Sequence, residues 1–223
     1  PEAGEFFSKI MTSKVVDEPD YARSIWKNVI EKADKYNAPG TFSAFIGYEW
    51  SSLGIKPPGN LHRVVIFKDG TDKTQKILPF SMFDSGNPED LWTFLESYEE
   101  KTGGEVLAIP HNGNVSNGEM FSLNDYKGSP WGRDYAKLRS RWEPLYEVTQ
   151  TKGDGETHPV LSPADEFSDY ETWNSWDGRT IQQEVTADWK GQKKYEYARS
   201  ALKLGLQKQA LLGINPFKFG FIG

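Results

Sequence analysis

Three residues of the types that bind catalytic metals stand beside apolar runs that predict strands. Glu49 ends one run, His62 opens a second, and His111 directly follows a third. Carboxylate and imidazole groups are ligands for Zn, Mn or Fe, and α/β folds gather their chemistry at strand ends. We therefore expect Glu49, His62 and His111 to bind divalent metal ions, with Glu49 and His111 also taking part in catalysis.

Five further polar residues are candidates for contacting a substrate. Asn112 and Asn114 lie in a sharp turn that follows the third apolar run. Glu147 lies inside an apolar strand, where a carboxylate must be paired, hydrogen-bonded or bound to a metal because burying an isolated charge is too costly. Asp154 and His158 lie in a turn rich in glycine and acidic residues, which fits a cation site and a solvated loop about equally.

The composition and the motifs exclude several classes of function. The net charge is −6 and the sequence has no Lys/Arg stripe, so no nucleic-acid partner is expected. No run approaches the roughly 20 apolar residues that span a bilayer, so no membrane partner is expected. The sequence has no cysteine, and therefore no thiolate metal site, and it has no nucleophile-elbow, phosphate-loop or zinc-helix motif. A small-molecule substrate remains the expected partner.

Start and stop signals predict three helices, over residues 17–36, 88–102 and 195–212. The first has Asp17 as its cap and a proline in its first turn. The second has Asn87 as its cap, with acidic residues facing the helix dipole, and ends at Gly103. The third ends at Gly213. These local signals fix where the helices begin and end.

Apolar runs predict five strands, over residues 41–48, 62–67, 105–109, 145–149 and 217–222. The polar segments between them are a connector (1–16), a loop too long to be only a connection (112–130) and an irregular, insertion-like stretch (150–192). Strands this apolar, alternating with helices, indicate a largely parallel sheet or barrel. The sequence therefore predicts a single α/β domain over residues 1–223.

Several segments resemble the PHP superfamily (polymerase and histidinol phosphatase). Gly47-Tyr48-Glu49 is followed by His62 at the start of a strand, and a later strand ends in Pro110-His111-Asn112. The sequences of residues 109–114, 147–154 and 215–220 are similar to those of one branch of the superfamily. That branch is a large bacterial family described only as a domain of unknown function. The resemblance covers essentially the whole chain.

This resemblance implies a distorted (β/α)7 barrel, a di- or trinuclear metal site at the carboxyl ends of its strands, and phosphoester hydrolysis. Glu49 matches the bridging carboxylate, and His62 and His111 match two histidine ligands. The superfamily's opening His-x-His and Asp-His pairs and its closing Asp-x-His pair have no counterpart here. The chain is thus expected to be an internal fragment with an incomplete barrel and metal site, its missing strands belonging to a longer parent protein. The compartment stays open, with the bacterial periplasm or exterior slightly favoured.

Three functions are compatible with these residues. The leading hypothesis is a metal-dependent hydrolase of small phosphoesters, with loop 112–130 lining the pocket and the tryptophan-rich stretch 153–189 shaping specificity. An alternative is a non-catalytic binding or scaffold domain that keeps the barrel without a complete metal site. A third is a metal-free glycoside hydrolase that uses Glu49 and Glu147 as its acid and base beneath stacking tryptophans.

Overall fold

The computed structural model describes residues 19–52, 59–173, 175–176, 179–180 and 189–223. The expected connector 1–16 and the expected cap Asp17 lie outside these residues. The helices are α2 (Pro19–Tyr36), α3 (Thr71–Thr74), α4 (Pro88–Thr102), α5 (Arg133–Trp142), α6 (Trp189–Gln192) and α7 (Ala198–Leu212). The strands are β1 (Ile46–Trp50), β2 (Arg63–Phe67), β3 (Val106–Pro110), β4 (Leu145–Glu147), β5 (Thr149–Gln150), β6 (Gly153–Asp154), β7 (Ser175–Trp176), β8 (Arg179–Thr180) and β9 (Gly220–Ile222).

The largest sheet in the described residues has three strands in the order β1-β2-β3, and both pairs are antiparallel. The prediction of a largely parallel sheet is therefore wrong for this sheet; among the strands that the structure describes, only the small β4-β9 pair is parallel. The closed barrel stays a prediction. We call the end of the sheet at Ile46, Phe67 and Val106 the α3 end, and the end at Trp50, Arg63 and Pro110 the β4 end.

The connection from β2 to β3 explains the antiparallel direction. β2 ends at the α3 end, and the chain then returns to the β4 end, where the Ser52 hydroxyl donates to the Gly86 carbonyl at 2.6 Å. From there α4 runs along the sheet again, and the Gly103 carbonyl that follows it accepts from Lys73 at 2.8 Å. Because this connection crosses the sheet twice, β3 starts where β2 ends.

The helix signals of the sequence are realised in α4. The Asn87 side chain accepts a hydrogen bond from the Glu89 amide, Pro88 is the first helical residue, and Gly103 ends the helix in the left-handed conformation with φ of 63°. Only glycine adopts that conformation without strain. The predicted first helix is α2 in the described residues, and the third is shorter than predicted, since a 3₁₀ turn (Lys193–Tyr195) precedes α7.

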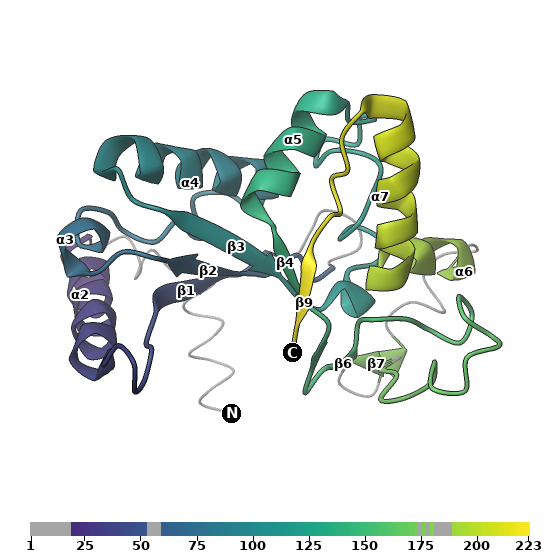
Figure 1. The fold of residues 1–223 in the computed structure, drawn as a ribbon, viewed down its shortest axis with the longest axis horizontal. Coiled ribbons are helices and arrows are strands. Elements are labelled where there is room, and N and C mark those ends of the chain that lie inside the picture. Colours follow the sequence, from purple (N-terminus) through teal and green to yellow (C-terminus); the bar gives the residue numbers. More distant parts are fainter. Residues whose placement is uncertain (1–18, 53–58, 174, 177–178, 181–188) are drawn as a thin grey trace.

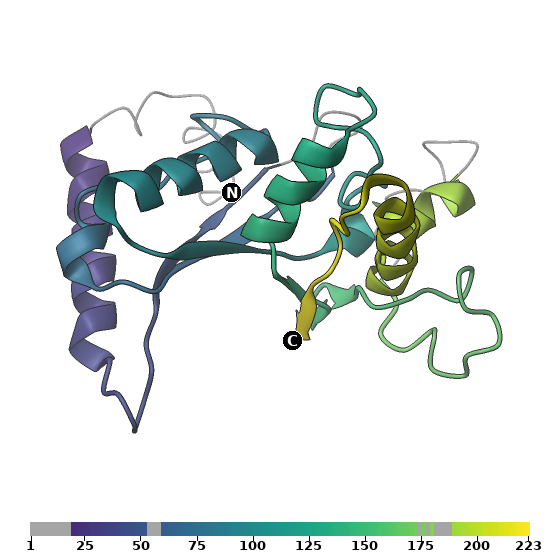
Figure 2. The ribbon, with the colours of Figure 1, turned by 45° about the horizontal axis from the view of Figure 1, so that its top comes forward.

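Helices α4 and α5 lie on the same side of the sheet, while α2 and α7 stand at opposite sides of the molecule (Figure 1; Figure 2). The face of α4 that meets the sheet is apolar and fully buried, with Trp92 and Leu95 packed against Val65 and Phe67. A second core joins α5 and α7 to the loop before α5, through Phe121, Ala201 and other buried residues. None of the described helices has the length and apolar character needed to cross a bilayer.

Two regions differ from the sequence expectations. The stretch 133–142 forms α5, which the apolar pattern does not reveal because its buried face carries Arg139 together with Ala136 and Trp142. The described part of 150–192 consists mainly of turns, with the hairpins β5-β6 and β7-β8 and the short helix α6.

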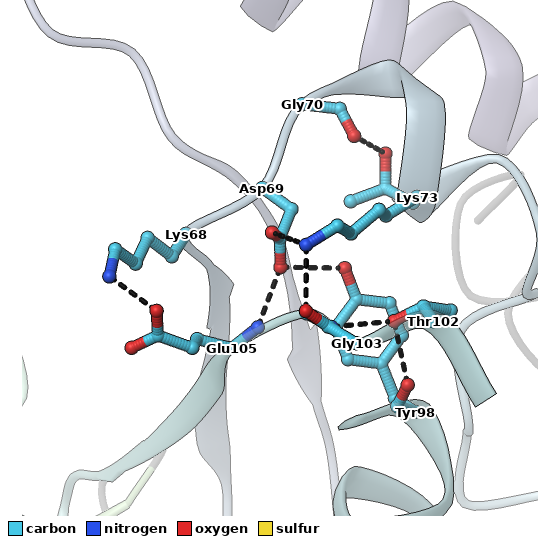
Figure 3. Close-up of polar contacts among 10 residues, drawn as sticks. Lys68, Asp69, Gly70, Lys73, Tyr98, Thr102, Gly103 and Glu105 are labelled. Carbon is cyan, nitrogen blue, oxygen red and sulfur yellow. Dashed lines mark hydrogen bonds and ion pairs between the residues drawn. The ribbon is translucent and has the colours of Figure 1, made fainter. Parts of the chain in front are cut away.

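A polar network fastens the α3 end of the sheet (Figure 3). The Asp69 carboxylate, just after β2, accepts from the Lys73 ammonium at 2.8 Å, the Tyr98 hydroxyl at 3.0 Å and the Glu105 amide at 2.7 Å. These contacts tie together the end of β2, α3, α4 and the start of β3. Burial opposes ionisation of Asp69, but these bonds outweigh it and hold the pKa of Asp69 below its ordinary value.

Candidate metal centre

The antiparallel sheet gathers three predicted ligands at the β4 end. In strands, alternate side chains point to opposite faces. Arg63, Val65 and Phe67 face the buried core under α4 and α5, so His62 lies on the other face of β2. The register pairs Glu49 with Val64, and the His111 amide donates to the His62 carbonyl. Glu49, His62 and His111 therefore share this second face.

The side chains of these three residues meet. The Glu49 carboxylate oxygen Oε1 lies 2.9 Å from His62 Nδ1 and 3.2 Å from His111 Nε2. The two imidazole rings are edge to face, with centroids 5.9 Å apart. One ligand atom from each residue lies within 4.8 Å of the others. The expectation that all three sit at carboxyl ends of strands is wrong for His62, which precedes β2 at its amino end.

Electrostatics favour the protonation states that a metal requires. Burial lowers the pKa of His111 to about 4, and burial also lowers the pKa of His62, so both imidazoles are neutral at pH 7. Burial opposes ionisation of Glu49, but the hydrogen bond from His62 and the interaction with His111 keep its pKa below the ordinary value. The group thus presents two neutral imidazoles and one carboxylate, the states in which these side chains bind metals.

Two ring nitrogens of the group have no hydrogen-bond partner among the described residues. They are His62 Nε2 and His111 Nδ1, and both are buried. Glu147 Oε2 lies 3.9 Å from His111 Nδ1, beyond hydrogen-bond distance. Buried polar atoms are normally bonded, so such nitrogens indicate a site whose bonding is completed by something other than these side chains.

Other predicted substrate contacts surround the group at different distances. Glu147 approaches His111 directly, and burial raises the pKa of Glu147. Asn112 follows His111 in the left-handed conformation, with φ of 55°, and its side-chain oxygen has no bonded partner in the described residues. The Asn114 amide donates to the Lys152 carbonyl at 2.9 Å. Asn114 thereby attaches the β5-β6 hairpin to the loop after His111.

Asp154 and His158 do not join the Glu49 group. The Asp154 carboxylate accepts from the backbone amides of Glu156 and Thr157, at 2.9 and 3.2 Å, and shapes its own turn. His158 is buried, its Nδ1 accepts from the Val160 amide at 3.1 Å, and its ring packs on Tyr197. These contacts explain both residues as parts of the turn structure.

One charged residue near the site was not predicted from the sequence. Lys152 lies in the β5-β6 turn, and its charge contributes to lowering the pKa of both His62 and His111 and counteracts the raised pKa of Glu147. A lysine five residues after Glu147, in a turn that leads back to the same strand end, is the signal that points to it.

The chain was compared with known proteins. No curated protein and no solved structure matches it. One family model matches residues 2–223, which is nearly the whole chain. The chain therefore belongs to the family described as Protein of unknown function (DUF3604).

Proposed function

We propose that this protein is a metal-dependent hydrolase of small phosphoesters, with its centre at Glu49, His62 and His111. The observation that carries the proposal is the meeting of one carboxylate and two imidazoles within 4.8 Å, on three different strand ends. Such a donor set is typical of Zn, Mn and Fe sites. The buried His62 Nε2, which has no bonded partner in the described residues, supports the same interpretation.

Each side chain has a distinct task in this proposal. Glu49, His62 and His111 hold the cation, and a bound divalent cation supplies Lewis-acid activation of water and of phosphoryl oxygens. The Glu147 carboxylate lies 3.9 Å from His111 Nδ1, and its negative charge there favours the tautomer of His111 that carries its proton on Nδ1. Lys152 adds positive charge beside the centre, which favours an anionic substrate. Asn112 offers an amide to the substrate.

The resemblance of Gly47-Tyr48-Glu49, His62 and Pro110-His111-Asn112 to the PHP superfamily supports phosphoester chemistry in particular. We propose that the DUF3604 family shares the superfamily's metal-binding ancestry and its barrel. The resemblance implies ligands at the carboxyl ends of strands; His62 departs from that pattern, because it precedes β2 at its amino end.

Metal titration of the 223-residue chain, after treatment with a chelator, tests the proposal. We expect Zn²⁺ or Mn²⁺ to bind and to raise the melting temperature, since a ligand at 100 times its dissociation constant stabilises by about 2.7 kcal/mol. The variant His111→Ala should weaken metal binding by at least about 100-fold, more than the loss of a residue that only orients a ligand, and should abolish hydrolysis of p-nitrophenyl phosphate. The matched control His158→Ala should retain metal binding.

The outcomes separate the competing functions. Metal binding without hydrolysis of any phosphoester would favour the scaffold alternative. Hydrolysis of glycosides that survives the chelator would favour Glu49 and Glu147 as a metal-free acid and base. Equal loss of metal in His111→Ala and His158→Ala would place His158 in the centre after all.

A further inference from the structure

Two buried arginines share one carboxylate on the opposite face of β2 from His62. Arg63 Nε donates to Glu143 Oε1 at 2.9 Å, and Arg139 Nε lies 3.2 Å from Glu143 Oε2. The side chains of Arg63, Arg139 and Glu143 are 1%, 4% and 3% exposed. Because two guanidinium groups face one carboxylate, the trio carries an excess positive charge, which is costly to bury without a further anion.

The other guanidinium nitrogens of this cluster are only partly bonded to the described residues. Arg63 Nη1 donates to the Leu61 carbonyl, and Arg139 Nη2 donates to the Met120 carbonyl at 2.6 Å. This leaves Arg63 Nη2 and Arg139 Nη1 without a bonded acceptor among the described residues. The Tyr135 hydroxyl has none there either, and burial raises the pKa of Tyr135, so its hydroxyl stays a donor at neutral pH.

These three residues line one pocket. Its volume is about 260 Å³, and its walls come from the first turn of α4, from α5 and from the loop that precedes α5. Arg63, Arg139 and Tyr135 supply the donors, whereas neither Glu49 nor His111 contributes to the lining. The pocket is therefore separate from the proposed metal centre.

The part of the lining nearer solvent is mainly acidic, with three half-buried carboxylates and one exposed cation, Lys127. The carboxylates are those of Glu89, Glu119 and Asp125. Glu89 Oε1 accepts from the Tyr126 amide at 3.0 Å, which holds the loop against α4. Because Arg63 and Arg139 are buried, a ligand that enters meets the three carboxylates and Lys127 first and the guanidinium groups deeper in. This order of charges selects against a molecule that is negative at both ends.

We propose that this pocket binds a small monocarboxylate whose far end is neutral or cationic, with Arg63, Arg139 and Tyr135 donating to the carboxylate group. Guanidinium groups match a carboxylate in both charge and geometry. The bound carboxylate balances the excess charge of the arginine pair and supplies the acceptors that the three donors lack.

Three compounds of matched length test the proposal: butyrate, 4-aminobutyrate and succinate. The readout is the indole N–H resonance of Trp92, whose Nε1 donates to Glu143 at 3.1 Å and so reports on the arginine pair. We expect saturable binding, with 4-aminobutyrate at least as tight as butyrate and succinate the weakest. No saturable shift of this resonance with any of the three, or tightest binding of succinate, overturns the proposal.

Variants locate the binding without dismantling the core. Tyr135→Phe removes a single hydroxyl and should weaken butyrate binding about tenfold, the usual effect of losing a hydrogen bond to a charged group. Arg139→Lys keeps the charge but loses the planar donor geometry, and should weaken binding by at least about tenfold. Tyr21→Phe, on an exposed part of α2, should change nothing. Unchanged affinity in both pocket variants overturns the proposal.

A further arm separates this pocket from the metal centre. The titration is repeated with a chelator present and in His111→Ala. Because the pocket does not include the metal ligands, butyrate should bind with the same affinity in both cases. Loss of binding in His111→Ala would assign the carboxylate to the centre at Glu49 and would also overturn the proposal.

Discussion

The two ends of the β1-β2-β3 sheet both hold a carboxylate among polar side chains, yet they use it differently. At the α3 end, Asp69 accepts three hydrogen bonds, and each comes from a different element (Figure 3). At the β4 end, Glu49 contacts two histidines through one oxygen, and those histidines keep buried nitrogens with no bonded partner in the described residues.

The two carboxylates also differ in their exposure to solvent. The Asp69 side chain is 12% exposed, whereas that of Glu49 is 49% exposed. A carboxylate surrounded by bonded donors stabilises the fold, because each donor would otherwise lose its partner. A half-exposed carboxylate beside neutral imidazoles contributes little to packing but remains accessible to a cation. A structural network and a binding site therefore differ less in residue type than in whether all their polar atoms have hydrogen-bond partners.

Removing each carboxylate should produce the largest contrast. Asp69→Ala leaves the Glu105 amide and the Tyr98 hydroxyl without their hydrogen-bond acceptor. We therefore expect the free energy of unfolding to fall by about 3 kcal/mol. Glu49→Ala, in metal-free protein, should cost less than about 1 kcal/mol because its side chain is half exposed. Urea unfolding of both variants in the presence of a chelator measures the difference. Equal losses would mean that the Glu49 group is also a structural network.

Lowering the pH should reduce the stability of the fold through both ends of the sheet, but in different pH ranges. The expected loss is smaller than that in Asp69→Ala. The pKa of His111 is about 4 in the folded chain against an ordinary 6.5, so the unfolded chain binds the proton first as the pH falls. Stability should therefore drop by about 2 kcal/mol between pH 6.5 and 4 in metal-free protein. Asp69, whose folded pKa is lowered, should lose its contribution only as the pH falls below about 3.8.

Two variants assign these ranges. His111→Gln should reduce the decline between pH 6.5 and 4 to the part that His62 contributes, because the pKa of His62 is also lowered by burial, and should leave the acid unfolding at lower pH unchanged. Asp69→Asn should do the reverse. Unfolding free energies measured in urea at closely spaced pH values test both. A decline as large in His111→Gln as in the unmodified chain would assign it to another group and would contradict the prediction that His111 is held neutral.

Local signals in the sequence were sufficient for some parts of this fold. The bounds of α4 follow from Asn87, Pro88 and Gly103, because capping depends only on neighbouring residues. The ligand types Glu49, His62 and His111 were visible because each stands beside an apolar run. Their proximity was predicted too, although for a parallel arrangement that the main sheet does not have.

Other features depend on contacts between distant segments, and the sequence pattern does not contain them. The direction of β3 is set by the path of the chain between α3 and α4. The strand predicted at 41–48 is β1 at Ile46–Trp50, because its bounds are set by pairing with β2. Helix α5 was not predicted because one residue of its buried face, Arg139, is charged. The burial of Arg139 depends on Glu143 and on Arg63, which lies 80 residues before Glu143 in the chain.

The smallest expected effect is on metal affinity and comes from Glu147, the last residue of β4. Glu147 Oε2 lies 3.9 Å from His111 Nδ1, on the side of the ring away from Glu49. When Nε2 binds a cation, the ring proton must sit on Nδ1, and a carboxylate there favours this tautomer. Glu147→Gln keeps an acceptor but removes the charge, so metal affinity should fall about tenfold.

A carboxylate at the α3 end provides the control for this last measurement. Glu105 is exposed and paired with Lys68, so Glu105→Gln makes the same chemical change far from the centre and should leave metal affinity unaltered. Calorimetric titration with Zn²⁺ compares the two variants. A loss greater than about 100-fold in Glu147→Gln would identify Glu147 as a ligand, since residues that only hydrogen-bond to a ligand contribute about 10- to 100-fold. No loss at all would show that the orientation of His111 comes from the backbone turn at Asn112.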